Sequence, residues 1–188
     1  MTQETGVREE NEVILTLIAQ GKSQEAYERA RENLRLAVAA KCGALEGNCA
    51  YTLGRAAHEC GQHSAALRAY TQALGKAIQF RDKKATASIH FTMATALLER
   101  SDGSRRENLE LAIGSHIAAL GMLTEAARPL DYAKIQYNMG FALAELTTRF
   151  GQSFRTEARE CFEKAASAFR KAGLESEARM AQQAGRQI

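Results

Sequence analysis

Residues 47–80 read GNCAYTLGRAAHECGQHSAALRAYTQALGKAIQF, a pattern that predicts two helices joined by a short turn at Gly61. Gly54 in the first helix and Ala66 in the second, 12 positions later (66 − 54), would let the two backbones approach closely. Tyr70 supplies the bulk that fills the remaining space. A single hairpin of this kind cannot cover its own apolar faces, so we expect copies of it along the chain.

Three further segments repeat this pattern. The position of Gly54 is taken by Ile14, Ala94 and Gly140, at spacings of 40, 40 and 46 residues (54 − 14, 94 − 54 and 140 − 94). Isoleucine in place of glycine predicts that the first pair of helices packs differently from the others, as terminal repeats often do.

The two later copies differ from the second in their internal spacing. The alanine that corresponds to Ala66 is Ala112 in the third copy and Ala158 in the fourth. Each lies 18 residues after its marker position (112 − 94 and 158 − 140), not 12. We therefore expect both late copies to share a turn that is lengthened by about six residues.

Polar residues mark the expected helix starts. Ser23, Asp82 and Asp131 are placed to act as N-caps. Ser104 and Glu107 have the spacing of a capping box, in which each side chain bonds a free backbone N–H of the first turn.

The pair Leu53-Gly54, the glycine turn and the residues Ala66, Tyr70 and Ala73 resemble the signature of the tetratricopeptide repeat (TPR) family. The resemblance implies an all-α fold, a right-handed α-α superhelix of about four helical hairpins plus a C-terminal capping helix. Periods above the usual 34 residues make the chain similar to extended bacterial-type arrays with repeats of 40–46 residues. We expect a single TPR-like domain over 1–188, with repeats at 7–41, 42–81, 82–128 and 129–172 and a polar capping helix at 174–187.

Composition and charge agree with an all-helical protein. Hydrophobic residues make up 45% of the 188-residue chain and aromatic residues 6%, and there is a single proline. The 25 basic and 22 acidic residues are interspersed, with a net charge of +3. Nucleic-acid-binding domains gather basic residues on one face, whereas the short clusters at 81–84 and 105–106 are typical of solvated helix ends. We expect no nucleic-acid binding.

The sequence predicts a cytoplasmic protein without membrane insertion. Residues 1–13 contain no apolar run of the kind found in signal peptides, and no stretch approaches 18 consecutive apolar residues. Cys42, Cys49, Cys60 and Cys161 show no CxxC spacing, so we expect buried thiols in a reducing compartment.

The sequence shows no pattern of catalytic residues. None of the four histidines follows a glutamate by three positions, as in the Glu-x-x-His pairs of helical di-iron sites. Neither a glycine-rich phosphate loop nor a GxSxG motif is present. His58, Cys60 and His63 surround one turn, but structural zinc normally takes four protein ligands. We expect no enzymatic activity, no cofactor and no metal site.

In the TPR family, the first helix of each hairpin lines a concave groove, and the resemblance places candidate partner-binding residues of this chain in that groove. Their aromatic side chains would contact apolar parts of a partner, their amides would bond its backbone, and their basic groups would attract acidic side chains. The aromatic residues could instead pack against a neighbouring helix, and the sequence leaves both arrangements open. The candidates are Asn48, Tyr51, Arg55, His58, Phe91, Thr95, Lys134, Tyr137, Asn138 and Phe141.

The resemblance favours a protein–protein interaction module that binds a partner peptide or helix in its groove, as adaptors, scaffolds and chaperone-like proteins do. Two alternatives stay open. One is a self-associating structural scaffold, which would form a homo-oligomer, and the other is a regulatory domain that senses a small ligand.

Overall fold

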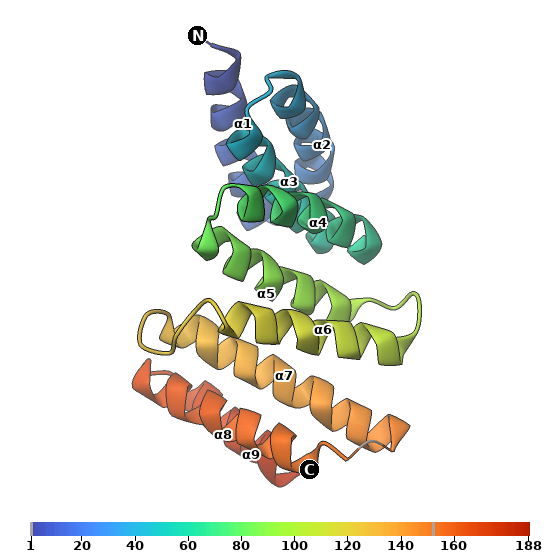
Figure 1. The fold of residues 1–188 in the computed structure, drawn as a ribbon, viewed down its shortest axis with the longest axis vertical. Helices are drawn as coiled ribbons and strands as arrows, with labels where there is room; N and C mark the ends of the chain where they lie inside the picture. Colours follow the sequence, from blue (N-terminus) through green and yellow to red (C-terminus); the bar gives the residue numbers. More distant parts are fainter. Residues whose placement is uncertain (1, 152) are drawn as a thin grey trace. The chain divides into compact units, whose positions relative to one another are not determined.

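The computed structural model describes residues 2–151 and 153–188, and this part of the chain forms nine α-helices joined by short turns (Figure 1). In chain order they are α1 (Gln3–Ala19), α2 (Ser23–Ala39), α3 (Gly43–Glu59), α4 (His63–Gln79), α5 (Lys83–Glu99), α6 (Arg105–Leu120), α7 (Pro129–Phe150), α8 (Arg155–Lys171) and α9 (Glu175–Arg186).

The first five helices follow a regular period of 20 residues. Each is 17 residues long, and they begin at positions 3, 23, 43, 63 and 83. After each of the first four helices the backbone adopts a left-handed conformation, with φ of 73° at Gly21, 54° at Lys41, 69° at Gly61 and 55° at Arg81. The 40-residue spacing in the sequence therefore corresponds to two helix-and-turn units of equal length.

The hairpin α3–α4 is packed around the contact predicted between Gly54 and Tyr70. Tyr70 is fully buried, and a Cβ added to Gly54 would stand only 2.4 Å from two carbons of its ring. Ala66 and Ala73 are buried beside it. Glycine in α3 thus allows the Tyr70 ring to lie directly against the helix backbone. In α1, Ile14 occupies the corresponding position and is itself fully buried.

The prediction of one lengthened turn shared by the two late hairpins is wrong. Ala112 is the eighth residue of α6, whereas Ala66 is the fourth residue of α4, so most of the extra spacing there is one additional helical turn. In the fourth hairpin the extra length lies mainly in α7. This 22-residue helix continues ten residues past Gly140 (150 − 140), while α3 continues five past Gly54 (59 − 54).

Two of the predicted helix caps are confirmed. The Asp82 carboxylate accepts the backbone N–H of Ala85 at 2.9 Å, at the start of α5. The Ser104 hydroxyl accepts the backbone N–H of Glu107 at 3.3 Å, at the start of α6. Each bond satisfies one of the N–H groups that a first helical turn leaves without a partner.

The other two predicted caps are wrong because their helices begin earlier. Ser23 is the first residue of α2, with Lys22 at the N-cap. Helix α7 begins at Pro129, whose fixed φ suits a first helical position, so Asp131 lies inside the first turn. There its carboxylate forms an ion pair with Arg128 at 2.5 Å.

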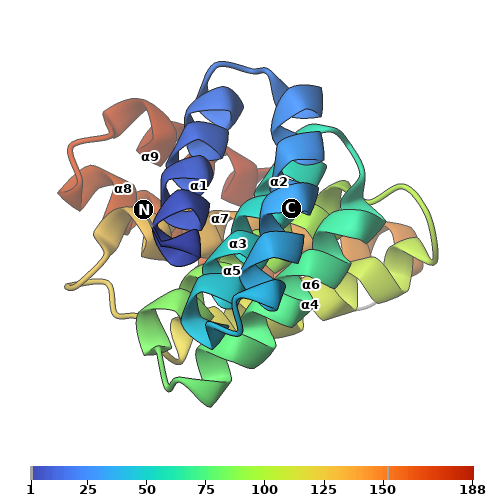
Figure 2. The same ribbon diagram turned by 90° about the horizontal axis from the view of Figure 1, so that it is seen from above.

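The chain divides into two compact units, Met1–Ala96 and Leu97–Ile188. In the first unit, α1 pairs with α2 (Figure 2) and α3 pairs with α4 around Tyr70. In the second unit, α7 packs against α6 and α8, and α8 packs against α9. Throughout the described ranges, no helix combines the length and the apolar character that a membrane span requires.

Candidate functional site

The predicted groove residues lie on three helices. Four are on α3, two are on the part of α5 that belongs to the first unit, and four are on α7 in the second unit. The structure gathers some of them into two hollows, one in each unit. Asn48 and Tyr51 line the first hollow, and Tyr137 and Phe141 line the second.

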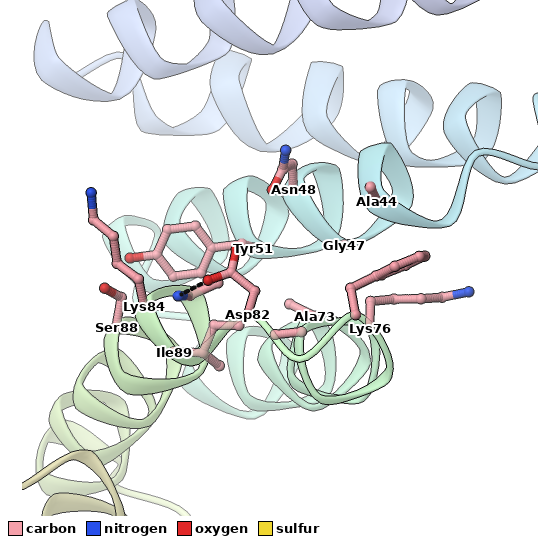
Figure 3. Close-up of a pocket in the computed structure, with 13 residues that line it drawn as sticks. Ala44, Gly47, Asn48, Tyr51, Ala73, Lys76, Asp82, Lys84, Ser88 and Ile89 are labelled. Carbon is pink, nitrogen blue, oxygen red and sulfur yellow. Dashed lines mark hydrogen bonds between the residues drawn. The ribbon is translucent and has the colours of Figure 1, made fainter. Parts of the chain in front are cut away.

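The hollow of the first unit, here named the α3–α5 pocket, has a volume of about 390 Å³, within the range of small ligand sites, about 300–1,000 Å³ (Figure 3). It lies between α3, the C-terminal half of α4 and the first turns of α5. Its lining consists of Ala44, Gly47, Asn48, Tyr51, Ala73, Lys76, Ala77, Phe80, Asp82, Lys84, Ala85, Ser88 and Ile89.

The α3–α5 pocket exists because small side chains line it where larger ones could have filled the space. Ala73, Ala77 and Ala85 each extend only one carbon from the backbone. At Gly47 a Cβ would stand 2.9 Å from the Cβ of Lys76, so glycine here keeps α3 and α4 close. At the rim, Phe80 is 51% exposed although it is a large apolar residue. An apolar group of a ligand would cover it.

The rim of the α3–α5 pocket is polar and carries charges of both signs. Lys76 forms an ion pair with Glu46 at 2.8 Å, and its hydrogen bond lowers the pKa of the Glu46 carboxyl. Lys84 is exposed at the rim, next to the Asp82 carboxylate that caps α5. Asn48 is also exposed, so its amide can donate and accept hydrogen bonds toward the pocket.

Four of the predicted residues in the first unit lie outside the lining of this pocket. Arg55 and His58 are half-buried further along α3. The His58 ring packs edge-on against the His63 ring, with the two ring centroids 5.3 Å apart. On α5, Phe91 is half-buried, and the Thr95 hydroxyl donates to the Phe91 carbonyl at 3.1 Å. That internal bond ties the Thr95 hydroxyl to its own helix.

In the second unit, Tyr137 and Phe141 belong to an aromatic cluster. The ring centroids of Tyr137 and Phe141 are 4.9 Å apart, those of Phe141 and Phe162 are 5.0 Å apart, and those of Tyr137 and Phe169 are 6.2 Å apart. Tyr137 is half-buried, and burial raises the pKa of its phenol. Phe141 stays 47% exposed. Tyr137 therefore packs mainly inward, while Phe141 presents its ring to the surface.

The α7–α9 hollow, with a volume of about 520 Å³, lies beside this cluster. The exposed Lys134 and the half-buried Asn138 are outside its lining. The lining residues are Tyr137, Phe141, Ala144, Glu145, Thr148, Phe162, Met180, Gln183, Ala184, Gln187 and Ile188.

Sequence reasoning missed the residues that lie away from the three groove helices. In the first unit these include Phe80, directly before the short basic cluster at 81–84 that was interpreted as a solvated helix end. Lys84, the last residue of that cluster, was also missed although it lies on α5. In the second unit they are Phe162 of α8 and Met180 of α9. An apolar residue directly before a basic cluster was the available signal for Phe80.

Cys49 and Cys161 are buried, whereas Cys42 and Cys60 are half-buried. Burial raises the pKa of the Cys49 and Cys161 thiols to about 11, so both are protonated and poor nucleophiles at neutral pH. The Cys60 thiol lies 4.0 Å from the side-chain oxygen of Gln24.

No protein-family model matches the chain, and no curated protein matches it. Two solved structures are similar to it, both of nearly identical TPR-like repeats from a Podosopora anserina protein provisionally named a kinesin light chain. They are 14% and 13% identical in sequence, with TM-scores of 0.62 and 0.63. Each match covers 99% of this chain and 95% or 96% of the other. The chain therefore has the fold that the sequence predicted, an all-α solenoid of TPR-like helical hairpins.

Proposed function

We propose that the protein is a non-catalytic interaction module that binds a peptide or helix of a partner protein. The observation that carries the proposal is the α3–α5 pocket, an open hollow with an apolar floor and a polar rim in the first unit. Repeat proteins of stacked helices use such surfaces to hold extended or helical segments.

The pocket residues suit the parts of a peptide in different ways. Tyr51 and Phe80 offer aromatic surface to an apolar side chain. The exposed Asn48 amide is suited to bond a peptide backbone, and Lys84 is suited to attract an acidic group. Arg55 and His58 lie outside the pocket lining, one and two helical turns beyond Tyr51 on α3, where they would extend this surface toward a longer peptide.

Selection of peptides from a random displayed library on the purified chain tests the proposal. Peptides that bind should lose about tenfold or more in affinity on Tyr51→Ala or Asn48→Ala, a change expected when one central contact is removed. Gln79→Ala, at an exposed α4 position outside the pocket, is the matched control. If the selected peptides bind all three variants equally well, the pocket is not the binding site.

A further inference from the structure

Helix α6 in the second unit exposes large apolar side chains on one face. Leu111 is 57% exposed and Ile117 is 58% exposed, and Met122, just after the helix, is 43% exposed. The opposite face packs against α7 and includes the fully buried Leu109 and Ala112. A helix that is apolar on both faces is normally covered on both. One face of α6 therefore lacks the cover that its composition requires.

This exposed face is also almost free of charge. No charged residue lies between Glu110 and Glu125 in the sequence. The nearest charges on the face, Arg106 and Glu110, form an ion pair with each other at 2.9 Å. On α8, in contrast, exposed positions carry charges such as those of Glu163 and Lys164. A charge that is removed from water without a partner is destabilising, so the surface that covers α6 must itself be apolar.

Gly114 lies at the centre of the exposed face. Leu111 and Ile117 are three residues before and after it, which places them about 60° to either side of it on the helix surface. A Cβ added to Gly114 would meet no atom within 4 Å, so no contact in the described part of the chain requires glycine here. Glycine inside a helix is also less favourable than alanine. The face therefore has a notch in its backbone between two large side chains.

A second copy of α6 fits this face. In a two-fold contact the same patch of both copies meets, so the patch must be complementary to itself. Two antiparallel α6 helices that cross at Gly114 approach closely at the two notches, and Leu111 and Ile117 of both copies surround the crossing point. Helix α6 has 16 residues and is only about 24 Å long, whereas a standard interface buries about 800 Å² on each partner. The contact is therefore weak, with a dissociation constant of roughly 10–100 μM.

We propose that the exposed face of α6 is the interface of a two-fold dimer of this chain, in which two antiparallel α6 helices cross at Gly114. A second copy supplies an uncharged apolar surface with a matching notch, which is what the face lacks. The antiparallel arrangement also places the opposite ends of the two helix dipoles together. This inference does not rest on the proposed function, because the α3–α5 pocket belongs to the first unit and contributes no residue to the contact.

Analytical ultracentrifugation of the full chain from about 1 μM to about 500 μM tests the proposal, and the natural chain should pass from monomer to dimer across this range. Leu111→Lys and Leu111→Glu should each weaken the dimer at least about tenfold, because each brings two like charges into the apolar contact. Leu111 is 57% exposed, so both variants should keep the circular dichroism spectrum of the natural chain. Gln79→Lys, at an exposed position of α4, is the matched control and should dimerise normally.

An equal mixture of the Leu111→Lys and Leu111→Glu chains provides the decisive comparison. The two-fold contact brings residue 111 of both copies to the same side of the crossing point, so the mixed pair has opposite charges there. At low salt the mixture should dimerise several-fold more tightly than either variant alone.

The notch at Gly114 is tested separately. Gly114→Leu should weaken the dimer at least about tenfold, because its side chain keeps the two backbones apart. Gly75→Leu is the matched control, since Gly75 lies in α4 and a Cβ there also meets no atom within 4 Å. That variant should dimerise as the natural chain does.

Three results would overturn the proposal. They are a natural chain that stays monomeric over the whole range, a dimer that is unchanged by the substitutions at Leu111 and Gly114, and a mixture that dimerises no better than its two components. Tyr51→Ala, in the α3–α5 pocket, should leave the dimer unchanged. Failure of the dimer is therefore distinguishable from failure of the peptide site.

Discussion

Replacement of Gly54 by alanine should destabilise the first unit, although alanine is the better helix former. The new Cβ would stand 2.4 Å from two ring carbons of Tyr70, which is 1.0 Å inside the shortest ordinary contact of 3.4 Å. The Tyr70 ring is fully buried, so a shift of the ring must displace neighbouring side chains. Overpacking of a filled core lowers the free energy of unfolding by about 1–3 kcal/mol. We expect a loss near the upper end of this range because the ring is rigid and buried.

The helix propensity of alanine offsets about 1 kcal/mol of this cost. We therefore expect Gly54→Ala to lower the free energy of unfolding by about 2 kcal/mol. Gly75→Ala is the matched control, because Gly75 lies inside α4 with no atom near its would-be Cβ. That variant should be more stable by about 0.5–1 kcal/mol.

Urea denaturation followed by circular dichroism measures both changes. With a slope of about 2 kcal/mol per molar urea, Gly54→Ala should lower the unfolding midpoint by roughly 1 M, and Gly75→Ala should raise it. In a Tyr70→Leu background, Gly54→Ala should lower the free energy of unfolding by at least about 1 kcal/mol less than it does in the natural chain, because the ring that clashes with the new Cβ is absent. A Gly54→Ala variant as stable as the natural chain would refute the packing argument.

Three further predictions follow from backbone strain, burial and titration. Lys41→Gly and Arg81→Gly should each raise the free energy of unfolding by about 1 kcal/mol in urea denaturation, because both residues hold a left-handed φ that costs non-glycine residues energy. Burial lowers the pKa of His116 to about 4. Below about pH 6.5 the unfolded chain therefore binds a proton on His116 that the folded chain does not bind until about pH 4. As the pH is lowered through that window, the free energy of unfolding should fall by on the order of 3 kcal/mol. Thermal melts of the natural chain should show this loss, and those of His116→Gln should show a flatter profile. With a thiol reagent at pH 8, Cys49 and Cys161 should react only as fast as the protein opens, because burial raises their pKa to about 11, and equal rates at all four thiols would contradict this.

The helical hairpins could be predicted from the sequence because their determinants are local. The offset between Gly54 and Ala66 and the aromatic residue at Tyr70 are short-range patterns. The structure brings Gly54 and Tyr70 into the expected contact and buries Ala66. The caps at Asp82 and Ser104 are local in the same sense. A residue type at a given offset within one or two helices specifies such features, so they can be read without knowledge of the rest of the chain.

The two hollows and the length of α7 were decided by the tertiary structure. Tyr51 and Phe80 meet at one pocket only because α3 packs on α4, and Phe162 lies beneath α9 only because α8 turns back at Gly173. Hollows are left where side chains from separate helices fail to fill a shared space. Their volume depends on the sum of many distant contacts, and no single stretch of sequence contains that information.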